Sequence, residues 1–234
     1  MTSFDEVLAL GDDALIAAQR LSQWCARAHD MEEDVALTNI ALDQLGAARL
    51  LLSYAGELEG AGRDEDALAY LRDDRQFRNV LLVELPNGDF AATVAKLLFL
   101  ATAQVGRYQK LAAGTDQRLA GIAAKAVKEC AYHVEHAALW TIRLGDGTGG
   151  SHTRMQAAVD GIWPYTYELF EGGEELRPEW LATVEPVLAG ATVTRPADGG
   201  WAPRGGREGR HTEHLSYLLA EMQVLHRAHP GAQW

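Results

Sequence analysis

The sequence predicts an all-α fold, with four long antiparallel helices and shorter helices appended to them. Three observations indicate this class: apolar residues recur with spacings of three and four over long stretches, alternating strand patterns are nearly absent, and Gly- or Pro-rich turns separate the stretches. At 1.5 Å per residue, a helix from about Glu32 to Ala55 is ~35 Å long. That length is typical of a helical bundle.

The N-terminal part of the chain is expected to form three helices before Pro86. Asp12 and Asp13 are N-cap candidates for a helix that reaches about His29. The elements expected next are a helix over about Glu32–Ala55, a polar connector over Gly56–Arg63, a short helix around Glu65–Arg72 and a mixed segment to Glu84. Pro86–Asp89 then combines turn residues with an N-cap.

The second half continues this pattern. Expected elements are a helix over Phe90–Ala113, a helix over Gln117–Leu144, a helix from near Thr153 that Pro164 interrupts, a helix over Pro178–Leu188, a brief strand at Thr192–Thr194, a Gly- and Arg-rich loop over about 195–210, and a last helix that Thr212 caps and that ends before Pro230. The Gln117–Leu144 stretch keeps one apolar face, formed by Leu119, Ile122, Ala126, Cys130, His133, Ala137, Trp140 and Leu144. We expect a single domain over residues 1–234.

The composition and the net charge argue against several classes of function. The 234 residues are 47% hydrophobic and carry a net charge of −12, which argues against binding to nucleic acid or to anionic lipid. Cys25 and Cys130 form no CxxC pair, so neither a disulfide framework nor a thiolate zinc site is expected. The N-terminus shows no basic signal region, and no apolar run approaches ~20 residues. We therefore expect a soluble cytoplasmic protein.

A long bundle with inward carboxylates suggests a di-iron site, which needs Glu-x-x-His on two helices because residues three apart share a helix face. The long helices contain no such motif. The one literal match, Glu208 to His211, lies in the Gly-rich loop, and we interpret it as a chance match. The sequence also contains no Gly-x-Ser-x-Gly motif, P-loop or dinucleotide fingerprint.

Two carboxylates are nevertheless predicted to point inward, Asp43 and Glu129. A buried ionised carboxylate needs a partner. Lys125 and His133 each lie four residues from Glu129, which makes a local ion pair available. The pattern is consistent with metal binding, but without ligand histidines it favours a buried salt-bridge network, with His133 as a core histidine.

One further segment is unusual because it is basic in an acidic chain. Its candidate contact residues are Trp201, Arg204, Arg207, Arg210, His211 and Glu213. They are compatible with an anionic partner surface or with ligand phosphates, since Arg and Trp are enriched at interfaces. They are equally compatible with a loop whose arginines contact the protein's own acidic residues.

Several longer segments resemble a known family. They are Glu33–Gly46, Arg75–Asn79, Val83–Phe90, Ala124–His133, Gly209–Leu215, Leu219–Gln223 and Pro230–Trp234. Together they resemble the C-subunit family of the phenylacetyl-CoA ring epoxidases, in order and over nearly the whole chain. The region from Asp160 to Arg195 resembles it least.

The resemblance implies a ferritin-like bundle inside a multicomponent oxygenase. In that family a sister subunit carries the di-iron centre and epoxidises the ring of phenylacetyl-CoA with O2, and a reductase supplies electrons from NADPH. The C subunit pairs with the catalytic subunit and is structural, its own metal site having degenerated. The resemblance therefore implies no cofactor in this chain.

Mapped onto this chain, Asp43 takes one bridging-Glu position with Gly46 in its His position, and Glu129 takes the other with Tyr132 in its His position. The two remaining Glu positions fall near Gln19 and Gln104. Glycine has no ligand atom and amides carry no charge, so this mapping gives an inactive site.

The leading expectation is a non-catalytic subunit that stabilises a di-iron partner, with a homodimer possible for the chain alone. The alternative is a stand-alone di-iron carboxylate oxygenase or ferroxidase with an atypical ligand set around Asp43, Glu129 and His133. A third possibility is that Arg207 and Arg210 contact the phosphates of coenzyme A in the assembled complex.

Overall fold

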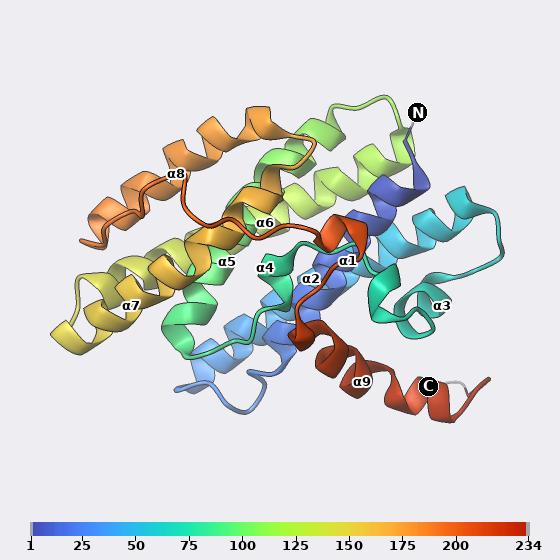
Figure 1. The fold of residues 1–234 in the computed structure, drawn as a ribbon, viewed down its shortest axis with the longest axis horizontal. Helices are drawn as coiled ribbons and strands as arrows, with labels where there is room; N and C mark the ends of the chain where they lie inside the picture. Colours follow the sequence, from blue (N-terminus) through green and yellow to red (C-terminus); the bar gives the residue numbers. More distant parts are fainter. Residues whose placement is uncertain (1, 233–234) are drawn as a thin grey trace. The chain divides into compact units, whose positions relative to one another are not determined.

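The computed structural model describes residues 2–232; Met1, Gln233 and Trp234 lie outside it, so the end of the Pro230–Trp234 motif has no structural account. Between residues 2 and 232 the regular elements are all helical, and no strand is present (Figure 1). The chain forms two compact units: residues to Pro86 together with those from Gly205 onward (unit 1), and Asn87–Arg204 (unit 2). Each unit contains one pair of long helices; the four-helix bundle that would combine the two pairs stays a prediction.

Unit 1 is built on α1 (Phe4–Ser22) and α2 (Met31–Glu59), which pack along their lengths. Helix α1 begins much earlier than expected, because the Ser3 side chain caps it by accepting a hydrogen bond from the Glu6 N–H at 3.2 Å. The expectation that Asp12 and Asp13 cap this helix is therefore wrong. Both are buried in the middle of α1.

Helix α2 confirms the predicted second helix and extends it at the C-terminal end. The Asp30 carboxylate accepts a hydrogen bond from the Glu33 N–H at 2.8 Å and caps the start. The helix continues to Glu59 because Gly60 supplies the left-handed conformation (φ 70°) that ends it. Unit 1 is completed by shorter helices: α3 (Glu65–Tyr70), η1 (Asp74–Gln76), α4 (Leu81–Glu84), η4 (Gly206–Glu208) and α9 (Glu213–Ala228).

Unit 2 is built on α5 (Phe90–Ala112) and α6 (Gln117–Gly145), which confirm both predictions to within one residue. The expected interruption at Pro164 is also confirmed, since α7 (Gly149–Ile162) gives way to the 3-10 helix η2 (Trp163–Phe170). The remaining elements are η3 (Glu174–Leu176) and α8 (Arg177–Gly190). The predicted strand at Thr192–Thr194 is wrong: Thr192 has φ 56°, and the Val193 N–H donates to the Leu188 carbonyl at 2.9 Å.

An aromatic cluster fixes α8 against α5 in unit 2. Phe99 and Trp180 lie 5.7 Å apart between ring centroids, and Trp163 and Phe170 each lie 5.4 Å from Trp180. The Trp180 indole N–H donates to the Phe99 carbonyl at 2.9 Å, which satisfies the polar atom of a buried indole. This cluster therefore holds α8 against α5.

Candidate functional site

On α6 the carboxylate that was predicted to point inward, Glu129, lies at the edge of the buried face. Glu129 is only half-buried and pairs with Lys125 at 3.0 Å, which confirms the expected local ion pair but not the expected burial. Tyr132 is 73% exposed, so it does not face the helix's buried side. The buried residues at the same spacing are Cys130 and His133.

On α2 the carboxylate that was predicted to point inward, Asp43, also lies at the edge of the buried face. Asp43 and Gly46 are half-buried, whereas Gln44 and Ala47, one position further along, are buried. A step of one residue turns the side-chain direction by about 100° around a helix, which is enough to move it from the buried side to its edge. The expectation that Asp43 is a buried core carboxylate is therefore wrong.

The residues on the buried sides do not fit a carboxylate-bridged di-iron centre. Within unit 2, the Cys130 thiol donates to the Gln104 side-chain oxygen at a separation of 3.6 Å, so this buried pair offers a thiol and a neutral amide rather than carboxylates. On α2, Ala47 offers no ligand atom. Within residues 2–232 no three His, Cys, Asp or Glu side chains form a group placed to hold a metal ion. Gln19, the other predicted position, is half-buried on α1.

Two residues of the predicted basic segment, Arg207 and His211, contact other segments of unit 1. Arg207 donates from Nη1 and Nη2 to the two oxygens of Asp13 at 3.0 and 2.6 Å, and from Nη1 to the Arg78 carbonyl at 2.7 Å. His211 is nearly fully buried against Glu84. For Arg207 the interpretation as a contact to the protein's own acidic residue is confirmed, and neither side chain belongs to an open loop.

The other members of the segment remain exposed: Trp201, Arg204, Arg210 and Glu213. Within unit 2, Arg204 pairs with Glu171 at 3.3 Å, and within unit 1, Arg210 pairs with Glu208 at 2.6 Å. Exposed ion pairs of this kind are weak and exchange partners readily. These residues therefore stay candidates for contacts to a partner or to an anionic ligand.

Unit 1 buries several charged side chains within its apolar core, and sequence reasoning missed them. The carboxylate of Asp12 and the guanidinium of Arg72 are fully buried and paired in a two-pronged contact, one arm of which measures 2.9 Å. The Arg78 N–H also donates to Asp12 at 2.8 Å. Burial raises the pKa of Asp12, and the charge and hydrogen bonds of Arg72 act against that rise.

A second buried group surrounds Glu84. Its two oxygens accept hydrogen bonds from the Thr212 N–H at 2.6 Å and from the Asn79 amide at 3.1 Å. The His211 ring places Nδ1 2.9 Å from Glu84 and Nε2 3.1 Å from the Phe77 carbonyl. His211 thus connects the Glu84 carboxyl group with the Phe77 carbonyl, and the His211–Glu84 pair is an ion pair when the ring is protonated.

The sequence did contain a signal for these buried acids. Asp12 and Asp13 interrupt an apolar run on α1, and Glu84 lies within the apolar run Leu81–Leu85. An acid in such a context predicts a buried pair with a distant base. The bases come from distant segments, so no local spacing reveals them.

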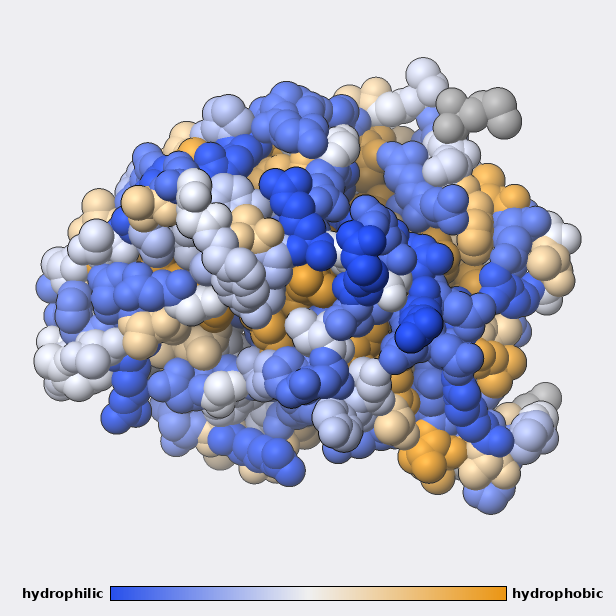
Figure 2. Space-filling view, in the orientation of Figure 1, coloured by the Kyte–Doolittle hydropathy of each residue, from blue (hydrophilic) through white to orange (hydrophobic). Residues whose placement is uncertain are grey.

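An apolar stripe lies exposed on α2. Met31, Val35, Leu42 and Leu45 are 77%, 55%, 57% and 45% exposed, and their spacings of four, seven and three place them on one face of the helix. Hydrophilic residues predominate on the face shown in Figure 2. By length and composition α2 passes as a helix able to cross a membrane, with 44% of the apolar window buried within the structure.

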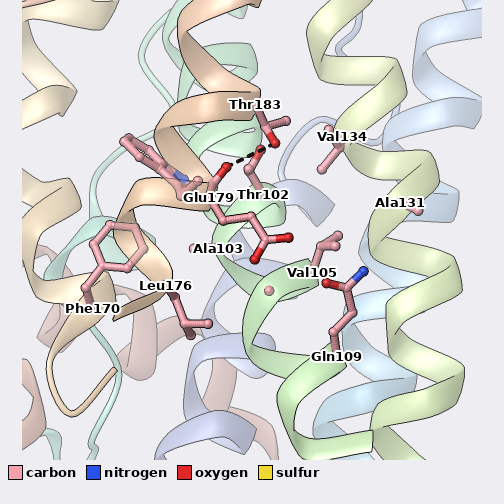
Figure 3. Close-up of a pocket in the computed structure, with 12 residues that line it drawn as sticks. Thr102, Ala103, Val105, Gln109, Ala131, Val134, Phe170, Leu176, Glu179 and Thr183 are labelled. Carbon is pink, nitrogen blue, oxygen red and sulfur yellow. Dashed lines mark hydrogen bonds between the residues drawn. The ribbon is translucent and has the colours of Figure 1, made fainter. Parts of the chain in front are cut away.

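Unit 2 also contains a cavity of about 290 Å³, bordered by α5, α6 and α8 (Figure 3). Its lining is mostly apolar. It lies beside the aromatic cluster, because Phe170 and Trp180 belong to both.

The described part of this chain thus combines an all-helical fold, buried polar pairs and an exposed apolar stripe on α2. The chain matches, over residues 1–234, the family model described as phenylacetic acid catabolic protein, and it belongs to that family. It is also similar to the C subunit of 1,2-phenylacetyl-CoA epoxidase from Escherichia coli (strain K12), with 46% identity over 97% of each chain. The resemblance found in the sequence is thereby confirmed.

Proposed function

We propose that this chain is a non-catalytic, structural subunit of a phenylacetyl-CoA epoxidase that serves phenylacetate catabolism, and that it pairs with and stabilises a di-iron sister subunit. The observation that carries the proposal is the composition of the buried helix faces. In the mapping that the resemblance implies, the two Glu-x-x-His positions hold Asp43 and Gly46 on α2, and Glu129 and Tyr132 on α6, so neither has its histidine. The buried residues beside them, Gln44 and Ala47 on α2 and Cys130 and His133 on α6, supply no carboxylate.

The cofactors belong, in this proposal, to the partners. The di-iron centre lies in the catalytic sister subunit, the NADPH site lies in the reductase, and phenylacetyl-CoA meets this chain only through the complex. This chain contributes rigidity, because ligand geometry at a metal centre must be held to within about 0.5 Å.

The exposed stripe on α2 is the surface proposed for docking the sister subunit. Four large apolar side chains facing water are costly at roughly 25 cal/mol per Å² of apolar surface, and a partner that covers them recovers that free energy. A stable pair of subunits needs an interface on the order of 2,000 Å², so the stripe supplies the apolar centre of a larger contact.

We place the protein in the cytoplasm. Cys25 and Cys130 are free thiols in the structure, as expected in a reducing compartment. A subunit that works with a reductase and a coenzyme A thioester needs access to both, and the cytoplasm supplies both.

Reconstitution of the complex tests the proposal. With purified sister subunits and reductase, epoxide formation should require this chain, yet His133→Ala and Glu129→Gln variants that still bind the partner should retain near wild-type turnover. Leu42→Asp on the α2 stripe should abolish both partner binding and turnover. If Glu129→Gln binds the partner normally and abolishes turnover, the chain contributes catalytic groups and the proposal fails.

A further inference from the structure

The cavity in unit 2 exists because its walls carry small side chains. Ala103 and Gly106 on α5 and Ala131 on α6 leave the space open. Figure 3 shows Phe170 and Leu176 on one side of it, and Ala131 and Val134 on the other. A Cβ built on Gly106 meets only Leu176, at 3.9 Å, so the space beside this glycine is empty rather than tightly packed.

Most polar groups that line the cavity already have partners. They donate to backbone carbonyls: Thr102 to Leu98 at 2.7 Å, Thr183 to Glu179 at 3.3 Å, and Trp180 to Phe99 at 2.9 Å. Two polar groups remain, the carboxylate of Glu179 and the side-chain amide of Gln109. Neither has a hydrogen-bond or ion-pair partner within the described residues.

The Glu179 carboxylate is directed into the cavity, towards Ala103 and Val105 (Figure 3). Glu179 is therefore the one charged side chain among the described residues that line this mostly apolar cavity. The matching occupant has an apolar stem that covers the walls and a cationic end that donates hydrogen bonds to the carboxylate. A volume of about 290 Å³ suits one long side chain. It is too small for a coenzyme A thioester, whose phosphates Glu179 would also repel.

We propose that this cavity receives an arginine side chain of the catalytic sister subunit, with Glu179 accepting its guanidinium. Arginine is favoured because its planar fork carries five donors and can reach the Gln109 amide oxygen as well as the carboxylate. The net charge of −12 of this chain favours a partner surface that presents cations. The inference rests on the proposed function, which supplies the partner.

Binding measurements with full-length proteins test this. The dissociation constant between this chain and the purified sister subunit is measured for the wild type, Glu179→Gln, Gly106→Leu and the control Glu174→Gln. Glu174 is an exposed acid of the same unit, lies outside the cavity lining and has no ion-pair partner among the described residues, so its variant makes the same charge change. Glu179→Gln and Gly106→Leu should each weaken binding by about tenfold or more, and Glu174→Gln by less than about twofold.

Stability measurements show whether weaker binding comes from the lost contact or from a less stable variant. Glu179 has no side-chain partner to lose in the described part of the free chain, so Glu179→Gln should leave the thermal unfolding midpoint unchanged. Arginines on the sister subunit are then replaced by alanine one at a time, and one of them should show non-additive coupling with Glu179→Gln.

The outcomes separate the two proposals. If the wild type binds the sister subunit and Glu179→Gln binds as tightly, the arginine pocket is wrong while the proposed function stands. Equal weakening by Glu174→Gln, or strict additivity with every arginine variant, overturns the pocket as well. If the wild-type chain does not bind the sister subunit at all, the proposed function itself fails.

Discussion

The two units of this protein add different interactions to their apolar cores. In unit 1, the Asp12–Arg72 ion pair and the Glu84–His211 pair are buried and join segments that are distant in the sequence. In unit 2, aromatic rings pack around Trp180. Charge pairs specify their partners closely but are costly when one partner is lost, whereas aromatic packing is tolerant of pH and salt. Mutations in the two units should therefore lower stability in different ways, with a dependence on pH in unit 1 and none in the aromatic cluster of unit 2.

The largest effect is expected from breaking the fully buried pair in unit 1. Arg72→Ala leaves the Asp12 carboxylate buried without its base and should lower the free energy of unfolding by about 3–5 kcal/mol. Urea denaturation at pH 7 measures this. The raised pKa of Asp12 should rise further in the variant, and because the protonated acid carries no charge, the deficit should shrink as the pH falls. A deficit that stays constant from pH 7 to pH 4 would contradict the account.

Trp180→Phe is the matching change in unit 2. It removes an indole ring edge and the 2.9 Å hydrogen bond to the Phe99 carbonyl, and should cost about 1–3 kcal/mol. Because no charge is involved, the loss should be the same at pH 5 and pH 8 and at low and high salt. Denaturation curves under those four conditions measure the loss of stability. A marked salt dependence of that loss would contradict the proposed difference between the units.

Gly145→Ala tests packing at the end of α6. A Cβ there would lie 2.2 Å from the Ala191 carbonyl oxygen, so the substitution should cost about 1–3 kcal/mol. Gly121 on the same helix has nothing within 4 Å of its Cβ position, and Gly121→Ala should raise stability by up to about 1 kcal/mol through helix propensity. Thermal unfolding of both variants gives the comparison; equal effects would show that the close approach has no energetic weight.

The smallest effect is expected at Asp198, where unit 2 also has a charge cluster but an exposed one. Hydrogen bonds from Tyr167, Arg195 and Arg177 lower the pKa of Asp198 to about 2. A depressed folded-state pKa means that the contribution is complete above the usual pKa of 3.8 and is lost as the pH falls towards 2. Because these side chains are partly exposed, we expect at most about 1 kcal/mol. Acid titration of Asp198→Asn should lack this component, and a wild-type profile in the variant would contradict the assignment.

Periodicity and turn chemistry predicted most of the helices, because α2, α5 and α6 each bury an apolar face that repeats every three to four residues. The start of α1 was missed because two acids within the helix resemble an N-cap, while the true cap is Ser3. The Thr192–Thr194 segment resembles a strand only locally, and its β-branched residues follow the last turn of α8.

The buried face of α6 was predicted correctly, since Cys130 and His133 lie on the predicted apolar face and are buried. The further expectation that Glu129 points inward was wrong, because Glu129 is half-buried at the edge of that face. A carboxylate at the edge of a helix face can turn to solvent and pair with Lys125, and spacing alone does not distinguish this from burial. The pairs of Arg207 with Asp13 and of His211 with Glu84 depend on long-range folding, which local patterns do not encode.

The central claim is that this chain belongs to an iron-dependent oxygenase without itself holding the iron. Its most direct test is iron quantification on the separated subunits after co-expression with the sister subunits in iron-replete cells. The account predicts about two irons for each catalytic sister chain and no stoichiometric iron on this one. Two irons for each copy of this chain would contradict it and would favour a stand-alone di-iron enzyme.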